Sequence, residues 1–273
     1  MKIAFATCVK LGLSCIEEIY RIGGNLDLLI SLKDENANSK SGRIYLDDIS
    51  TKKNVPLLKI DNINDQEVLS ALSEYKIDWL FIIGWSQIAK KELLCTPQKG
   101  CIGMHPTLLP QGRGRAAIPW AILKELDETG VTMFKLDEGV DTGDIIAQGR
   151  ISMHSKINAT ELYEKVNEMH VKLISNYWES IYTNTVKLSV QDESKATFWE
   201  GRTPKDGEIK KNMFVKDAEK LVRAITHPYP GAFYKMDDKI MKIWSATISP
   251  EKNGENSIKL KDGYLIPENF EII

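Results

Sequence analysis

The chain has 273 residues, of which 42% are hydrophobic and 27% charged, and its formal net charge is -2. This composition is typical of a folded globular protein and excludes a disordered or membrane-embedded class. Lys and Arg are not in excess, so a nucleic acid is not the expected main partner. The length is sufficient for one large domain and one small one.

The first residues predict a β-strand and not a leader peptide, because a single Lys is followed by a mixed run without a long apolar core. No stretch reaches the roughly 20 apolar residues of a membrane span, so no membrane partner is expected. The cysteines have neither disulfide nor metal-site spacing: Cys8, Cys15, Cys95 and Cys101. We therefore expect reduced thiols, a cytoplasmic location and no bound metal.

Short apolar runs alternate with helical patterns from residue 2 to about residue 153. Several runs are continuously apolar, as in strands that are buried on both faces. The predicted strands are 2–7, 26–32, 55–60, 77–84 and 101–105, and the predicted helices are 11–23, 65–76 and 89–97. This alternation favours an α/β fold with a doubly wound, Rossmann-like parallel sheet.

Two further strands are predicted at 131–137 and 144–153, on either side of the turn 138–143. A long helix follows at 159–182, with one apolar stripe.

The composition changes after Thr183, where few apolar runs remain. A helix at 215–226 and several short β-like runs then predict a small C-terminal domain that is β-rich and OB-like. The predicted organisation is a catalytic domain at 1–185, a linker at 186–202 and a C-terminal domain at 203–273.

The run GMHPTLLPQGRGRAAIPW carries the clearest chemical signal. A predicted strand ends at His105, and Pro106, Pro110, Gly112 and Gly114 then prevent a regular element before the next helix. Ligands of open α/β sheets bind at the carboxyl ends of the strands. An imidazole held there by a rigid loop is a candidate general base.

An acidic turn is the second feature, with Asp137, Glu138, Asp141 and Asp144 in eight residues. Four neighbouring carboxylates repel one another and are costly to bury, which favours a solvated loop. Alternatively, one of them lies beside the imidazole, where it would orient the ring and favour the charged form. Both interpretations stay open at this point.

The runs HPTLLPQGRGRAAIPWAI and ETGVTMFKLDEGVDTGDIIAQ together resemble the signature of the formyl-folate-dependent formyltransferases. The resemblance is greatest to the sugar N-formyltransferases and to the formyltransferase half of the bifunctional enzyme that acts on UDP-aminoarabinose. It extends to GWSQI at 84–88 and to RTPKDG and HPYPGAF near the C-terminus. It implies a methionyl-tRNA formyltransferase-like fold, N10-formyltetrahydrofolate as co-substrate and no metal.

In that family an Asn-x-His pair and a distant Asp form the catalytic set. His105 and Asp141 match the family's histidine and aspartate, whereas the asparagine position is Gly103. The family's asparagine donates to the formyl oxygen as it becomes an oxyanion, and losing such a donor costs about 100- to 1,000-fold in rate. A backbone N–H, a water or a side chain such as Gln87 could replace it. Otherwise the enzyme is slow or only binds its ligands.

The resemblance implies that the pterin of the folate lies against two short segments, although Trp85 as a core residue is an equal alternative. These residues are Trp85, Ser86, Gln87, Ile88, Glu138, Gly139, Val140 and Asp141. A second set of polar residues is predicted to bind the substrate, with solvation or pairing to the acidic turn as the alternative for the two loop arginines. This set is Lys10, Ser41, Arg43, Thr107, Arg113 and Arg115.

The predicted function is formylation of the amino group of a nucleotide-linked amino sugar for surface glycan or lipopolysaccharide biosynthesis. Family precedent favours a dTDP- or UDP-linked 4-amino-4,6-dideoxy sugar, without a nucleic-acid partner. Two alternatives stay open. Methionyl-tRNA formyltransferase would need a positive track for tRNA, and a catalytically silent folate or nucleotide-sugar binding protein is suggested by Gly103. A monomer and a homodimer also both stay open.

Overall fold

The computed structural model describes residues 1–35 and 42–273. The chain forms two compact units, and each unit is assembled from three segments. The first unit is Met1–Arg113, Gly130–Ile151 and Val166–Phe198, and the second is Gly114–Thr129, Ser152–Lys165 and Trp199–Ile273. The domain boundaries proposed from the sequence, at 185 and 202, stay a prediction.

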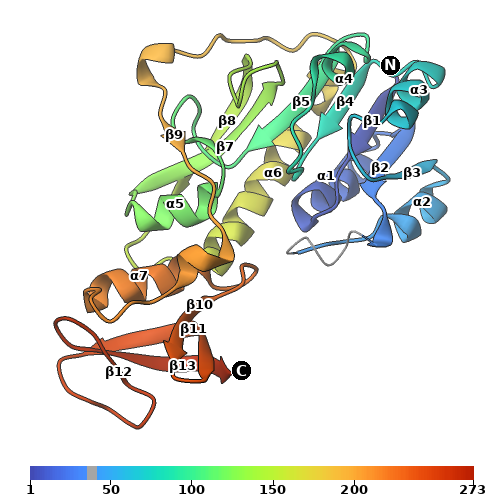
Figure 1. Ribbon diagram of the computed structural model, residues 1–273. Helices are drawn as coiled ribbons and strands as arrows, with labels where there is room; N and C mark the ends of the chain where they lie inside the picture. Colours follow the sequence, from blue (N-terminus) through green and yellow to red (C-terminus); the bar gives the residue numbers. More distant parts are fainter. Residues whose placement is uncertain (36–41) are drawn as a thin grey trace. The chain divides into compact units, whose positions relative to one another are not determined.

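A sheet of seven strands organises the first unit, in the order β3-β2-β1-β4-β5-β7-β8 (Figure 1). The five strands from β3 to β5 are parallel, which confirms the predicted doubly wound α/β fold. Strand β7 runs antiparallel to β5 and pairs Thr132 with His105. The strands are β1 Ile3–Ala6, β2 Leu28–Leu32, β3 Leu57–Ile60, β4 Trp79–Ile82, β5 Gly100–His105, β7 Glu128–Lys135 and β8 Ile145–Ser152.

The helices that connect these strands follow the predicted pattern with one addition. They are α1 Lys10–Arg21, α2 Asp47–Lys53, α3 Gln66–Glu74, α4 Lys91–Cys95 and α6 Ala159–Tyr182. Helix α2 was not predicted. It has no buried residue, so its sequence shows no apolar stripe from which a helix could be recognised.

The central strands β2, β1, β4 and β5 are buried on both faces. On one face, Phe5 and Phe81 stack with ring centroids 5.5 Å apart, and Phe81 stacks on Trp178 of α6 at 6.3 Å. On the other face, α3 contributes Val68 and α4 contributes Leu93 to a separate apolar cluster. This double cover explains why the strands are continuously apolar. It leaves the strand ends as the place for polar chemistry.

The second unit contains an antiparallel half-barrel with the strand order β10-β11-β13-β12, which confirms the predicted β-rich C-terminal region. Helix α7 packs against α5 and β11. The bounds are α5 Ala117–Leu123, α7 Val215–Ile225, β10 Ala232–Met236, β11 Lys239–Ser249, β12 Ile258–Lys259 and β13 Tyr264–Ile272. Two short strands, β6 Arg113–Gly114 and β9 Phe198–Trp199, pair with each other, and η2 Glu193–Lys195 and η3 Pro204–Gly207 are 3-10 turns.

The four cysteines are free thiols, and three of them are buried. Burial raises the pKa of Cys15, and it raises the pKa of Cys101 to about 12. These two thiols therefore stay protonated and unreactive near neutral pH. Within the described ranges, no helix has the length and hydropathy needed to cross a bilayer.

Candidate active site

His105 is the last residue of β5 and is 8% exposed. Its Nε2 atom lies 2.8 Å from the carbonyl oxygen of Gly112. Because a carbonyl only accepts, Nε2 carries the hydrogen of this bond. Nδ1 is therefore the nitrogen that can gain or release a proton, and it lies 3.6 Å from Oδ2 of Asp141. The ring is fixed on one side and free for proton chemistry on the other.

Gly112 aims the carbonyl that fixes the ring. Its φ of 70° lies in the left-handed region, which glycine adopts without steric cost. Its N–H donates to Oγ1 of Thr197 at 2.8 Å. The glycine in the loop after His105 is thus required by the backbone that orients the imidazole.

Asp141 is the residue of the acidic turn that approaches the imidazole. Its side chain is 18% exposed, whereas Asp137 and Glu138 are exposed. Asp137 instead organises the turn, since its Oδ1 accepts from Gly139 N at 3.1 Å and from Thr142 Oγ1 at 2.6 Å. Asp137 and Glu138 therefore lie in a solvated loop, and Asp141 is the carboxylate beside the imidazole. The distance of 3.6 Å is that of an ion pair and exceeds a hydrogen bond.

Gly103 lies two residues before His105, and the space beside it is filled. A Cβ atom built there would lie 2.7 Å from Cδ2 and 3.3 Å from Cγ of Leu136, and 3.5 Å from Cε1 of Phe134. Cβ atoms in real structures do not approach other atoms as closely as 2.7 Å. The side chain of Leu136, whose terminal methyl is the nearest atom, therefore has to shift before an asparagine fits at this position.

The first predicted folate segment follows β4. Oε1 of Gln87 accepts from Trp85 Nε1 at 3.1 Å and from Ile63 N at 2.9 Å, and its Nε2 donates to Asp61 O at 2.8 Å. Gln87 therefore ties this loop to the loop after β3, which argues against it as the replacement oxyanion donor. Trp85 is partly buried and packs against the core cluster.

An ion pair links the two predicted folate segments. Lys91, three residues after Ile88, contacts Oε1 of Glu138 with its Nζ at 2.9 Å, and this contact raises the pKa of Lys91. Ile88 is 72% exposed and Val140 is 48% exposed. Ser86 and Gly139 are exposed as well. The two segments thus present apolar surface to solvent near the same ion pair.

Of the predicted substrate-binding residues near the first two strands, Lys10 is exposed and the side chain of Arg43 is buried. Lys10 is exposed at the start of α1 and lies 3.7 Å from Glu17. The side chain of Arg43 is 6% exposed and donates to Ser31 Oγ and to Leu32 O. Arg43 thus stabilises the end of β2. Ser41 lies outside the described residues.

Thr107 is 2% exposed, and its hydroxyl has no hydrogen-bond partner among the described residues. Its carbonyl accepts from Thr132 Oγ1 at 2.7 Å. Since a buried hydroxyl without a partner is costly, Thr107 stays a predicted contact for a polar group.

The two loop arginines differ in burial: Arg113 is buried, and Arg115 is exposed. Arg113 is 1% exposed, and its guanidinium donates to both carboxylate oxygens of Glu193, at 2.8 and 2.6 Å, and twice to Oε1 of Gln191, at 3.2 and 2.8 Å. These four bonds leave little of the guanidinium to meet a bound anion. Arg115 belongs to the second unit, is exposed, and donates from its backbone to Trp199 O.

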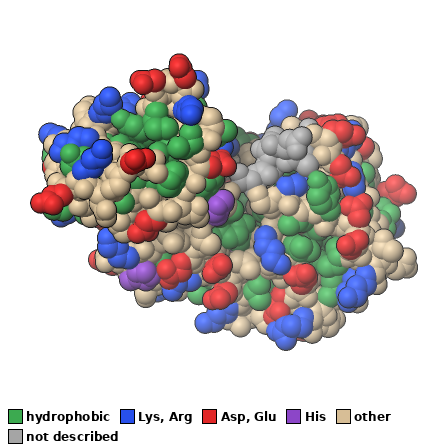
Figure 2. Space-filling view, turned by 90° about the horizontal axis from the view of Figure 1, so that it is seen from below, with side chains coloured by type: hydrophobic (Ala, Val, Ile, Leu, Met, Phe, Trp, Pro, Cys, Tyr) green, Lys and Arg blue, Asp and Glu red, His purple; other side chains and the backbone are tan. Residues whose placement is uncertain are grey.

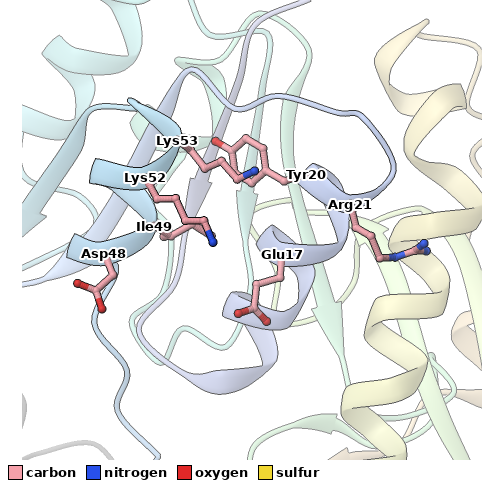
Figure 3. A pocket seen from close by; sticks show the side chains of 7 residues that line it. All are labelled: Glu17, Tyr20, Arg21, Asp48, Ile49, Lys52 and Lys53. Carbon is pink, nitrogen blue, oxygen red and sulfur yellow. The ribbon is translucent and has the colours of Figure 1, made fainter.

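A hollow of about 390 Å³ lies on α1 and α2 (Figure 3) and not at the end of β5. Charged side chains dominate its wall, which consists of Glu17, Tyr20, Arg21, Asp48, Ile49, Lys52 and Lys53. Helix α1 begins just after β1, and the hollow uses its later turns, which run away from the carboxyl edge of the sheet. The imidazole and the acidic turn therefore mark the candidate site better than this hollow does.

The pattern of the formyl transferase family matches residues 23–177, and that of the formyl transferase C-terminal domain matches residues 202–268. The chain belongs to the formyl transferase family. This confirms the resemblance found in the sequence, and the protein is a formyl-transferring enzyme. In this formyl transferase the family pattern spans β2 to α6, including the end of β5 and the acidic turn.

Relatives of this formyl transferase act on different acceptors. The methionyl-tRNA formyltransferase of Lachnospira eligens is 24% identical over 97% of this chain and 85% of its own length. An N-formyltransferase from Helicobacter canadensis, solved with folinic acid and dTDP-3-aminofucose, has a TM-score of 0.71 at 18% identity and covers 99% of this chain and 100% of its own. WlaRD, a sugar 3N-formyl transferase solved with dTDP and 5-N-formyl-THF, gives 0.70 at 19% identity, covering 98% and 96%. These structures share the fold.

Sequence reasoning missed three residues around the site of the formyl transferase. Gln191, Glu193 and Thr197 contact the loop or the turn that carries the predicted pair. They lie in the segment predicted as a linker, where polar residues without periodicity gave no signal of burial. Among the described residues, no group of three or more His, Cys, Asp or Glu could hold a metal ion.

Proposed function

We propose that this formyl transferase moves a formyl group from N10-formyltetrahydrofolate to the amino group of a nucleotide-linked amino sugar. The observation that carries the proposal is the His105 ring, with Nε2 bound to a carbonyl and Nδ1 facing the Asp141 carboxylate. Such a pair can accept a proton from an attacking amine and stabilise the resulting charge. The same proposal includes a cytoplasmic location and a role in surface glycan biosynthesis.

The chemistry follows from the pair. The neutral amine attacks the formyl carbon, a new N–C bond forms, and the carbonyl oxygen becomes an oxyanion. Nδ1 of His105 takes the proton that the amine nitrogen loses, and Asp141 stabilises the imidazolium. The bond from the formyl carbon to N10 of the folate then breaks, and the proton on Nδ1 passes to N10. Formyl amide and tetrahydrofolate leave, and the ring is neutral again.

The donor is proposed to lie against the segments 85–88 and 138–141. Exposed apolar side chains there, Ile88 and Val140, suit the flat ring system of a pterin. The folate ligands named for the two solved relatives support the same donor. Leu136 fills the room beside Gly103, so a backbone N–H or a water is the proposed donor to the oxyanion.

The sugar acceptor is supported by charge as well as by the solved relatives. The formal net charge is -2, and on the face shown in Figure 2 Lys and Arg side chains are interspersed with Asp and Glu. That face, as far as its residues are described, carries no continuous basic track of the kind that a tRNA backbone needs. Methionyl-tRNA is the second candidate acceptor, favoured by the similarity that covers nearly the whole chain.

The test is to incubate the protein with N10-formyltetrahydrofolate and a panel of dTDP- and UDP-linked sugars that carry the amine at position 3 or position 4. A mass gain of one formyl group on one of the sugars is the expected result. Family precedent favours a 4-amino sugar. Of the two solved relatives, one was solved with dTDP-3-aminofucose and the other is named a sugar 3N-formyl transferase. Formylation of methionyl-tRNA with no sugar product would overturn the proposal, as would binding of both ligands without turnover.

A further inference from the structure

The turn that carries Asp141 is held from a distant part of the chain. Asp141 has a φ of 56°, a left-handed conformation that is uncommon for residues other than glycine and that surrounding contacts can stabilise. The contact comes from Gln191, 50 residues later in the chain. Its Nε2 donates to the carbonyl of Asp141 at 2.9 Å and to that of Gly143 at 2.7 Å. One side-chain amide thereby bonds to the turn on both sides of Thr142, next to the residue that carries the carboxylate.

Gln191 is oriented in turn by Arg113. Its Oε1 accepts from Nε of Arg113 at 3.2 Å and from Nη2 at 2.8 Å. Because the guanidinium only donates and the two turn carbonyls only accept, the amide has a single satisfied orientation. Gln191 is 5% exposed and Arg113 is 1% exposed. Water is therefore poorly placed to replace a bond that is lost.

The same network reaches the imidazole. Arg113 follows Gly112, whose carbonyl accepts from Nε2 of His105. Thr197, in the segment that contains Gln191, bonds to this loop through its side chain and its backbone. Its Oγ1 accepts from Gly112 N at 2.8 Å, and its carbonyl accepts from Arg113 N at 2.9 Å. A shift of this segment would therefore displace both members of the proton-handling pair.

We propose that Gln191 is a positioning residue of formyl transfer, whose amide sets the separation between the Asp141 carboxylate and the His105 ring. The inference rests on the proposed function, in which these two groups handle the proton. The amide of Gln191 bonds to the backbone carbonyls of the turn, and it acts through that backbone. Transfer rates depend steeply on such placement, since a misplacement of about 1 Å caused by a distant change can cost roughly 100-fold.

The first test compares Gln191→Glu, Gln191→Met and a control in the same segment. Gln191→Glu keeps the size of the side chain and the acceptor for Arg113 but removes both N–H donors. The control is Lys195→Ala, whose side chain is 68% exposed and pairs with Asp192. We expect Gln191→Glu to lower kcat by about 10- to 100-fold with KM for the formyl donor within about twofold, and Lys195→Ala to change neither by more than about twofold. A loss confined to KM would overturn the proposal.

A double variant separates positioning from a general structural role. If Gln191 acts through Asp141, Gln191→Glu should lower the rate little further in an Asp141→Asn background, since coupled residues are not additive. A loss that persists undiminished in that background would overturn the inference and leave the proposed pair intact. Full activity of Asp141→Asn alone would instead refute the pair.

A measurement without substrate covers the case in which no acceptor is formylated, which would refute the proposed function alone. The chain has four histidines, so spectra of protein with ¹⁵N-labelled imidazoles are tractable, and His105→Gln assigns the ring. We expect a protonated Nε2 in the wild type and a shifted Nδ1 resonance in Gln191→Glu and Gln191→Met, but not in Lys195→Ala. An unchanged His105 ring in both Gln191 variants would overturn the positioning role.

Discussion

The two halves of the candidate site are built in different ways. His105 ends a strand whose backbone pairs with β4 and β7, and its ring bonds to a carbonyl seven residues further on. Asp141 stands in a left-handed turn that a side chain 50 residues away holds in place. The ring is thus held by a strand inside the sheet and by a loop that Thr197 contacts, and the turn by its own Asp137 and by the side chain of Gln191. Because the turn lies outside the strand ladders, we expect it to be the first to lose its geometry.

The largest expected effect tests whether both halves are needed. His105→Ala and Asp141→Asn should each lower the single-turnover rate by about 100- to 10,000-fold, the usual scale of a positioned acid or base. The double variant should lower the rate little more than the more damaging single variant does, because the two residues act as a unit. Rates at saturating formyl donor are the measurement, with circular dichroism as the control for folding. Wild-type rates in either single variant would refute the pair.

The next effect weakens the hydrogen-bond network that holds the turn and that also contacts the loop after β5. Arg113→Lys keeps a positive charge but loses the planar guanidinium, which donates hydrogen bonds to Glu193 and Gln191 at the same time. We expect a loss of about 2 kcal/mol in the free energy of unfolding by urea, the scale of hydrogen bonds to a charged group, together with a lower rate. The matched control is Arg223→Lys, which alters a comparable arginine bound to Glu219. It should cost stability without changing the rate, and equal rate losses in both variants would contradict the comparison.

A smaller effect is expected at Gly103, on the strand that carries His105. Because Leu136 fills the space beside it, Gly103→Asn should destabilise the protein by about 1–2 kcal/mol through overpacking. It should raise the single-turnover rate by less than about tenfold, which corresponds to roughly 1.4 kcal/mol of barrier. Gly103→Asn combined with Leu136→Ala restores the room, so any gain from a new amide donor should appear only there. A gain in rate of more than about tenfold in Gly103→Asn alone would show that the space beside residue 103 can hold the asparagine side chain.

The effect expected to leave the rate of formyl transfer least changed concerns His170, a histidine that its own helix holds. Nδ1 of His170 lies 2.7 Å from the carbonyl of Val166 one turn earlier, and burial lowers the pKa of His170 to about 4. The unfolded chain binds a proton here near pH 6.5 and the folded one does not. Stability from this group is therefore complete above about pH 6.5 and falls as the pH drops towards 4, by at most about 1.4 kcal/mol per pH unit. His170→Gln should flatten that slope in urea unfolding between pH 6.5 and 4.5, and an unchanged slope would contradict the assignment.

The sequence predicted the strand side of the site better than the turn side. Continuous apolar runs located β1 to β5, and the prolines and glycines after His105 marked a loop at a strand end. The local pattern did not distinguish Asp141 from Asp137, since both are acidic residues of one turn. The family resemblance pointed to Asp141, and the fold is what brings its carboxylate to the ring. The burial of Arg113 could not be predicted from the local sequence either, because its hydrogen-bond partners lie about 80 residues away.

The sequence by itself determined the order of the main strands and helices apart from α2, the position of the imidazole and the family, because these depend on local periodicity and on a contiguous motif. The tertiary structure decided which carboxylate faces His105, that Leu136 fills the space at Gly103, and that Gln191 holds the turn. Such contacts join residues far apart in the chain through hydrogen-bond direction and packing. No pattern of neighbouring residues encodes either, so only the folded chain could reveal them.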